Sequence, residues 1–317
     1  MTRLPVEKSI RHSRKRSGIL VPLIEDFMRK PVNIETPEDV KFINDLLEKM
    51  VEREERRRED AKLFSPSALA DCLRLVYLSK NFKELEIKKL FSSRPQPNFY
   101  FLNGNFLHVK WQFALYKMDQ AMDDDDFKLV AVEHPIVSKR GDHGGTVDVL
   151  IEVDREPLIV DFKGINVNDF NRIVRGELPH KYRIQCADYG MLYNASKDRK
   201  TRKIKRTLLV IENKGGPTED FPIALAETEI PVSTNLPDVR TRLEVLRKHE
   251  QENSIPPPEC ISTKSLKFQG CPFRGFCKEE VKEIEKRRAA NNRDTKKHRI
   301  AISKRRRSDR ARRNKQH

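Results

Sequence analysis

Two aspartates and one lysine lie on neighbouring β-rich runs and together could hold a divalent cation beside a phosphate group. Asp148 lies in the run 145–153, and Asp161 and Lys163 lie in the run 158–165. Mg²⁺ prefers oxygen ligands and often binds one or two carboxylates, with water and substrate phosphate completing its shell. Such a cation polarises a phosphodiester, while a lysine can orient the attacking water or stabilise a charged transition state. These residue types indicate metal-assisted phosphodiester cleavage.

A predicted hairpin brings these three groups together. A turn centred between Arg155 and Glu156 places Asp148 opposite Lys163. Because side chains alternate between faces along a strand, Asp161 and Lys163 share one face and Asp148 joins them; a bulge would shift this register. Burying two carboxylates with one ammonium is costly unless a cation compensates the charge. The alternative is an ordinary cross-strand ion pair on an exposed face, with Asp161 as a solvated neighbour.

Four short motifs follow one another within residues 65–277 and resemble those of a known enzyme family. They are a Gly-x-x-x-His motif ending at His108, a Gly-x-x-Asp motif ending at Asp148, an Asp-x-Lys motif formed by Asp161 and Lys163, and a Gln-x-x-x-Tyr motif formed by Gln185 and Tyr189. In this order, on a helix, two strands and a helix, they resemble the PD-(D/E)XK nucleases. The similarity is to the RecB-type branch, which includes AddB-like and CRISPR-adaptation nucleases.

The resemblance implies a role for each matching residue. His108, Asp148, Asp161 and the main-chain carbonyl of Phe162 would bind Mg²⁺ or Mn²⁺, and Lys163 would activate or orient water. Asp161 stands where many relatives have glutamate, and the family motif admits either acid. Gln185 and Tyr189 are one helical turn apart, so both can face the site or the DNA strand and are predicted as catalytic residues. Glu133 is interpreted as a solvated residue at a strand edge and is left out of the site.

Four of the five cysteines flank these motifs, with Cys72 before them and Cys260, Cys271 and Cys277 after them. Many RecB-type relatives hold an iron–sulfur cluster in this way, so the resemblance implies a [4Fe–4S] cluster. The usual pair of cysteines two residues apart is missing, since ten residues separate Cys260 from Cys271. Four thiolates can also bind zinc, and separate reduced thiols are a further alternative. Cys186 is interpreted as a separate buried thiol.

Hydrophobic periodicity predicts a restriction-endonuclease-like α/β (α+β) core, in which a central mixed β-sheet is flanked by helices. Residues 1–64 are expected to form a basic and helical N-terminal region. Residues 65–277 are expected to form the nuclease domain, closed by the cysteine-rich segment. Residues 278–317 are expected to form a basic tail, helical or disordered. Helices are predicted at 37–62, 67–80, 104–118, 183–195 and 236–253, and strands at 128–137, 145–153, 158–165 and 206–213.

The net charge of +16 is concentrated at the C-terminus. Residues 278–317 hold 17 Lys and Arg against 6 Asp and Glu, a balance of +11, which leaves +5 for the first 277 residues. Such a tail attracts polyanions through counterion release, although a solvated or localising segment has the same composition. No apolar run is long enough for a membrane span, and no signal peptide is recognisable. The expected location is cytoplasmic, or nuclear in a eukaryote.

The sequence therefore predicts a metal-dependent DNA nuclease, an exonuclease or an enzyme of ends and flaps, in recombination, repair or replication. The chain has no Walker motif, so a helicase, where one is needed, must be a partner. Two alternatives stay open, a non-catalytic nucleic-acid-binding protein on the same fold and an RNA-processing nuclease.

Overall fold

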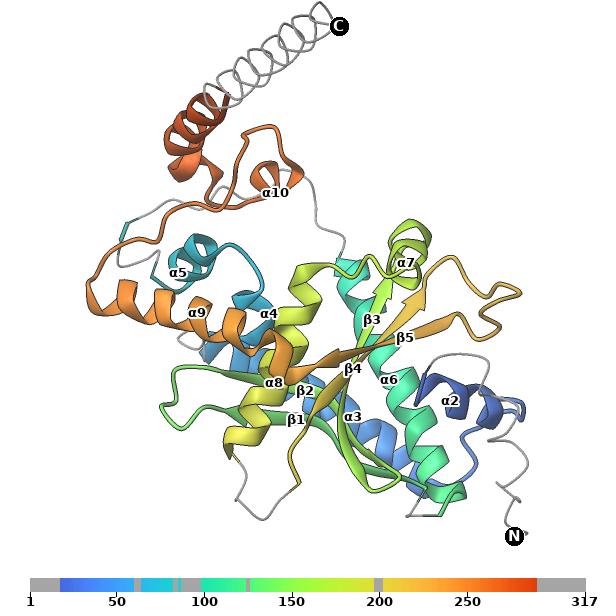
Figure 1. Cartoon of the computed structure of the whole chain (residues 1–317). Helices are drawn as coiled ribbons and strands as arrows, with labels where there is room; N and C mark the ends of the chain where they lie inside the picture. Colours follow the sequence, from blue (N-terminus) through green and yellow to red (C-terminus); the bar gives the residue numbers. More distant parts are fainter. Residues whose placement is uncertain are drawn as a thin grey trace, which may run out of the picture. The chain divides into compact units, whose positions relative to one another are not determined.

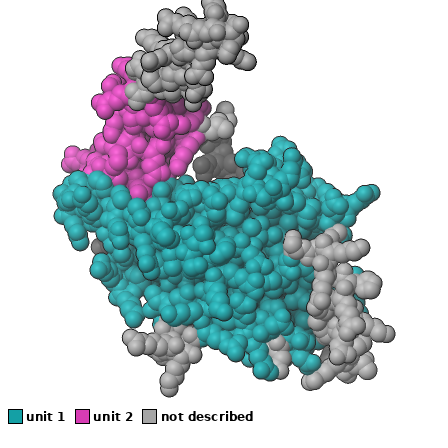
Figure 2. Space-filling model, in the orientation of Figure 1, with its two compact units in different colours: residues 1–71, 96–254 teal, residues 72–95, 255–317 magenta. Residues whose placement is uncertain are grey.

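A computed structural model describes residues 18–59, 64–81, 85–86, 98–123, 126–196 and 202–289. The chain forms two compact units, shown in different colours in Figure 2. Unit 1 draws on residues 1–71 and 96–254, and unit 2 on residues 72–95 and 255–317. The domain boundaries after residues 64 and 277 stay predictions. Residues 290–317 of the basic tail lie outside the described residues.

Unit 1 is built on a five-stranded mixed sheet in the order β1-β2-β3-β4-β5 (Figure 1). Strands β3 and β4 are parallel, and the other neighbouring pairs are antiparallel. The bounds are Phe127–Val137 for β1, Gly144–Val153 for β2, Glu156–Ile165 for β3, Arg206–Asn213 for β4 and Leu225–Pro231 for β5.

Helices cover both faces of this sheet because the strands are apolar on both sides. One cluster packs Trp111 and Leu115 of α6 with Val149 of β2, and another packs Tyr189 of α8 with Ile159 of β3. The predicted fold class, a mixed sheet flanked by helices, is confirmed and is consistent with a restriction-endonuclease-like core. The helices of unit 1 are α2 (Val21–Phe27), α3 (Pro37–Glu59), α4 (Pro66–Leu69), α6 (Asn98–Ala121), α7 (Val167–Val174), α8 (His180–Ser196) and α9 (Val232–Gln251).

The turn between β2 and β3 is tighter than the sequence analysis expects. Asp154 and Arg155 form a two-residue turn with φ of +50° and +60°, and the register runs from Val153 paired with Glu156. Positive φ at both central residues is typical of a hairpin turn that matches strand twist. Continuing this register places Asp148 opposite Asp161, so the predicted pairing with Lys163 is wrong by two residues. A shift of two residues keeps Asp161 and Lys163 on one face, as predicted.

Unit 2 contains α5 (Leu73–Asn81), α10 (Leu266–Gln269) and a helical stretch over residues 274–289. The single helix expected at 67–80 is interrupted, because α4 ends at Leu69 and α5 begins at Leu73. Cys260, Phe268, Cys277 and Val281 form the small core of this unit. None of the helices in the described ranges is long and apolar enough to cross a membrane.

Candidate active site

Asp148 and Asp161 lie where the ladder between β2 and β3 ends. The last regular pair is Val149 with Val160. Beyond it, the main-chain N–H of Phe162 donates to Asp148 Oδ2 at 2.9 Å. A side-chain oxygen thus takes the place of the main-chain carbonyl that would accept this bond in a regular ladder. Asp148 is 6% exposed and Asp161 only 1%. The end of the ladder therefore frees room for two carboxylates inside the sheet.

Lys163 and Gln185 hold the Asp161 carboxylate from two sides. Lys163 Nζ lies 2.6 Å from Asp161 Oδ2, and Gln185 Nε2 donates to Asp161 Oδ1 at 3.0 Å. Burial raises the pKa of Asp161 to about 6, with Lys163 opposing the shift and the Asp148 carboxylate adding to it. Burial alone would lower the pKa of Lys163, but the two carboxylates outweigh it and the pKa is raised. Lys163 is thus a firmly held ammonium.

Helix α6 packs on the face of the sheet opposite to α8 and brings His108 to Asp148. His108 Nδ1 lies 3.4 Å from Asp148 Oδ2 and has no hydrogen-bond partner among the described atoms. One ligand atom each from His108, Asp148 and Glu133 lies within 4.8 Å of the others, a set that could hold a metal ion. An imidazole nitrogen left without a partner beside two buried carboxylates fits a divalent cation with nitrogen and oxygen ligands.

Glu133, predicted from the sequence to be a solvated residue outside the site, lies within this group. It is 2% exposed on β1, in a left-handed backbone conformation with φ of +48°, so it is not a solvated edge residue. Gln112 Nε2 donates both to Glu133 Oε1 at 3.0 Å and to the Asp148 main-chain carbonyl at 2.9 Å. One amide therefore fixes Glu133 relative to Asp148. The signal that could have identified it is an acidic residue in the middle of the apolar run VAVEHPIV.

Tyr189 lies one turn beyond Gln185 on α8 and packs under β2. It is 6% exposed, and burial followed by the two aspartate carboxylates raises the pKa of its hydroxyl. Gly145 makes this packing possible, since a Cβ there would lie 2.9 Å from Pro66 Cδ and 3.5 Å from the Tyr189 ring. A Cβ at Gly104 would meet nothing within 4 Å. Of these two motif glycines, only Gly145 lies where neighbouring atoms of the described residues leave no room for a side chain.

The structure thus brings together the predicted residues His108, Asp148, Asp161, Lys163 and Gln185, with Tyr189 beside them. Phe162 contributes its main-chain N–H to Asp148, and its carbonyl as a metal ligand stays a prediction.

Cys72, Cys260, Cys271 and Cys277 all belong to unit 2 and are free thiols. Burial raises the pKa of Cys260, and each of the other three adds to the shift, which places all four within electrostatic reach of one another. Among the residues described, no three of these sulfurs lie mutually within 4.8 Å. Tetrahedral zinc with bonds of about 2.3 Å would need sulfurs about 3.8 Å apart. A four-iron cluster spaces its ligands more widely, because each sulfur binds a different iron.

Cys186 of α8 stands apart from this group. It is fully buried in unit 1, and burial raises the pKa of its thiol, as expected for a separate packed cysteine.

Comparison with solved structures gives distant similarities. A structure titled "Crystal structure of SSO0001" is 15% identical, covers 82% of this chain and 96% of its own, and has a TM-score of 0.38. An alkaline exonuclease (LHK-Exo) from Laribacter hongkongensis is 12% identical, covers 65% of this chain and 93% of its own, and has a TM-score of 0.42. No family model matches the chain, and no curated protein matches it by sequence. At TM-scores below 0.5 neither similarity says what the chain does.

Proposed function

We propose that the chain is a metal-dependent deoxyribonuclease that hydrolyses phosphodiester bonds. The observation that carries the proposal is the convergence of His108, Glu133 and Asp148 within 4.8 Å, next to the Asp161–Lys163 ion pair. Glu133, Asp148 and Asp161 are all buried, and a single lysine leaves two of their three negative charges uncompensated. A divalent cation supplies that compensation, and a binding protein without catalysis has no need for this charge arrangement beside a phosphate.

His108, Glu133, Asp148 and Asp161 would hold Mg²⁺ or Mn²⁺, which when bound supplies a Lewis acid for the scissile phosphate. Lys163 is the permanent positive charge of the site. Its ammonium, fixed at 2.6 Å from Asp161 Oδ2, is placed to orient a water molecule and to stabilise negative charge that develops on the phosphate.

Gln185 and Tyr189 serve this centre from α8. The Gln185 amide fixes the orientation of the Asp161 carboxylate through the 3.0 Å bond from Nε2 to Oδ1. The buried Tyr189 hydroxyl keeps its proton because its pKa is raised, so it acts as a hydrogen-bond group and not as a base. We assign both residues to positioning of the site or of the DNA strand.

DNA is proposed as the substrate, with ends or flaps in recombination, repair or replication as its context. The tail at 278–317, at +11, would add binding that is independent of DNA sequence and sensitive to salt. A helicase is a proposed partner, since the chain has no Walker motif of its own.

Digestion of end-labelled single- and double-stranded DNA, with matched RNA substrates, tests this proposal. Purified protein with Mg²⁺ or Mn²⁺ is compared with the same protein in EDTA and with Asp161→Ala. Metal-dependent DNA cleavage that Asp161→Ala lacks is expected, and the product ladder gives the polarity. Cleavage of RNA alone would identify an RNA-processing enzyme. Binding without cleavage of any substrate would favour the non-catalytic alternative.

We further propose that the four thiols of unit 2 bind a [4Fe–4S] cluster, with zinc as the weaker alternative. The support is that all four belong to unit 2, that three of them are buried, and that the other three act electrostatically on the pKa of Cys260. Arg74 is anchored beside Cys277, with its Nη1 3.9 Å from Sγ and 2.6 Å from Glu280 Oε2. Its guanidinium would offset the negative charge of a thiolate-bound cluster. Iron analysis and visible absorbance of protein purified without oxygen separate iron from zinc.

A further inference from the structure

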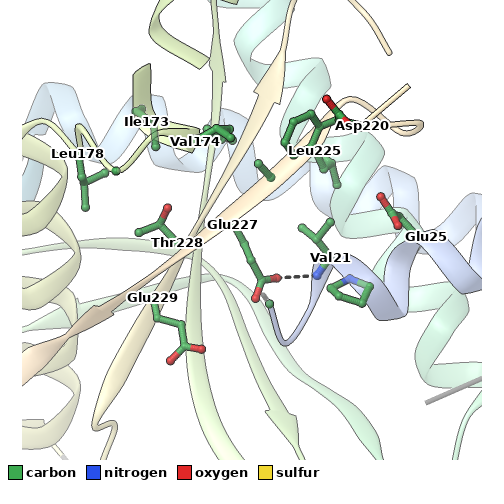
Figure 3. A pocket seen from close by; sticks show the side chains of 16 residues that line it. Val21, Glu25, Ile173, Val174, Leu178, Asp220, Leu225, Glu227, Thr228 and Glu229 are labelled. Carbon is green, nitrogen blue, oxygen red and sulfur yellow. Dashed lines mark hydrogen bonds between the residues drawn. The ribbon is translucent and has the colours of Figure 1, made fainter. Parts of the chain in front are cut away.

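Strand β5 is one of the two outer strands of the sheet in the described part of the chain, and a cavity of about 630 Å³ runs along it (Figure 3). The lining includes five consecutive residues of the strand, from Leu225 to Glu229. A cavity that follows consecutive residues of an outer strand is a groove at the edge of a sheet. Edge strands are places where another chain can pair.

The hydrogen-bond pattern shows which groups of β5 face this groove. The N–H of Val232 donates to the Lys205 carbonyl just before β4, and the Ala224 carbonyl accepts from the N–H of Asn213 at the end of β4. In an antiparallel ladder the residues that bond to the neighbour alternate, so even-numbered residues of β5 point their N–H and C=O toward β4. The main-chain groups of the odd-numbered residues Leu225, Glu227 and Glu229 therefore point away from β4. Leu225 is fully buried, so those of Glu227 and Glu229 are the ones that face the groove.

The two walls of the groove differ in chemistry. On one face of β5 lies α2, where Glu227 accepts main-chain N–H groups of Leu20 at 2.8 Å and Val21 at 2.6 Å, and Glu25 also lines the cavity. On the other face, Ile173 and Leu178 come from α7 and the loop after it. An added strand would alternate its side chains between these walls. One set would meet carboxylates and the other would meet aliphatic surface.

The groove is acidic on a strongly basic chain. Its lining includes Glu25, Asp220, Glu227 and Glu229, and none of the lining residues in the described ranges is Lys, Arg or His. Glu229 pairs with Arg206 at 2.7 Å, Glu227 accepts main-chain N–H groups, which carry no formal charge, and Asp220 is exposed. Acidic side chains therefore outnumber basic ones in the described lining. Nucleic acid is excluded as an occupant, because its phosphates would be repelled.

We propose that this groove binds an extended segment of a partner protein, in which Lys or Arg alternates with aliphatic residues, as a sixth strand beside β5. Main-chain bonds to Glu227 and Glu229 supply affinity. The alternation supplies specificity, because basic side chains face the α2 wall and aliphatic side chains face the α7 wall. The inference does not depend on nuclease activity.

A fluorescent nine-residue peptide of alternating Arg and Val, titrated with the full chain, tests the proposal by anisotropy. The control peptide has the same composition with all Arg before all Val. The informative variant is Glu229→Pro, because it removes an N–H that faces the groove and no bond to β4. Glu229→Gln is its match, since both lose the ion pair to Arg206. We expect Glu229→Pro to bind at least tenfold more weakly than Glu229→Gln.

Asp220→Lys tests the charge without touching the strand, with the exposed Glu244→Lys on α9 as its control. At least fivefold weaker binding is expected for Asp220→Lys alone. Equal binding of the two peptides, or equal effects within each matched pair of variants, would overturn the proposal. Binding that emerges only when Arg14, Lys15 and Arg16 are replaced by Glu would assign the groove to this chain's own N-terminal segment. That result would also overturn a partner protein as the occupant.

Discussion

Glu133 and Asp148 face each other across β1 and β2, with carboxylate oxygens within 4.8 Å. The strands pair Val132 with Val149 immediately beside them, and Glu133 then adopts φ of +48°. A non-glycine residue in this conformation costs about 1 kcal/mol or more and persists where the surroundings enforce it. Gln112, bonded to both residues, provides that constraint. We interpret this backbone distortion as the feature that directs the Glu133 carboxylate toward Asp148 and His108.

Glu133→Ala should weaken metal binding more than it weakens DNA binding. Loss of one carboxylate ligand from the set with His108 and Asp148 is expected to raise the Mg²⁺ or Mn²⁺ concentration for half-maximal cleavage at least tenfold. Calorimetric titration of the metal, beside cleavage at a series of metal concentrations, measures both effects. Glu152→Gln, further along β2, is the control. An unchanged metal requirement in Glu133→Ala would remove Glu133 from the site.

Asp161→Asn should abolish cleavage and leave the metal-free protein no less stable. The substitution removes one of two facing buried carboxylates, while the Asn oxygen can still accept from Gln185 Nε2. Relief of about 1 kcal/mol of repulsion between the two carboxylates corresponds to an increase of about 2–4 °C in Tm for a domain of this size. Thermal unfolding in EDTA, compared with wild type, measures it. A lower Tm in EDTA would mean that the Lys163 ion pair outweighs the repulsion from Asp148.

The sequence could predict the site residues because their spacing reflects local geometry. Period-two alternation places Asp161 and Lys163 on one face, and the predicted hairpin brings Asp148 close to them with either turn. The register itself depends on φ at Asp154 and Arg155, which composition alone does not determine. The place of Glu133 in an apolar run signals its burial, but its backbone conformation does not follow from the sequence pattern. A positive φ there arises with the contacts of Gln112, a residue 21 positions away in the chain.

The edge of the sheet is the other part that the sequence could not predict. Strand β5 carries Glu227 and Glu229 where an apolar alternation would identify a strand. Glu227 is held by main-chain groups near α2, more than 200 residues earlier. Pairing with β4 and contacts of this range decide the structure of such a segment, and local propensity does not.

Cys277→Ala should remove iron, visible colour and stability of unit 2 together. Cys277 is buried in the small core with Phe268 and Val281, so a cluster bound there is part of that core. Iron content, absorbance and resistance to proteolysis of protein purified without oxygen are the measurements. Cys186→Ala, in unit 1, should keep its iron and colour. Wild-type protein that is colourless, iron-free and fully stable would contradict the cluster.

Asp142 should contribute to stability at neutral pH and lose that contribution in acid. Burial acts to raise its pKa, but hydrogen bonds from Arg247 and Ser138 outweigh it and lower the pKa from 3.8 to about 2. The carboxylate binds protons less readily in the folded state than in the unfolded state. Its stabilisation is therefore complete above pH 4 and is lost as the pH falls from about 4 to 2.

Asp142→Asn is accordingly expected to lower the free energy of unfolding by about 1–2 kcal/mol at pH 7, with a smaller difference at pH 3. Urea unfolding at the two pH values measures it, with the exposed Asp238→Asn on α9 as the control. The comparison isolates the link between the β1–β2 loop and α9, because Arg247 Nε lies 2.8 Å from Asp142 Oδ2. An equal loss at both pH values would mean that packing around Asp142, and not its charge, stabilises this link.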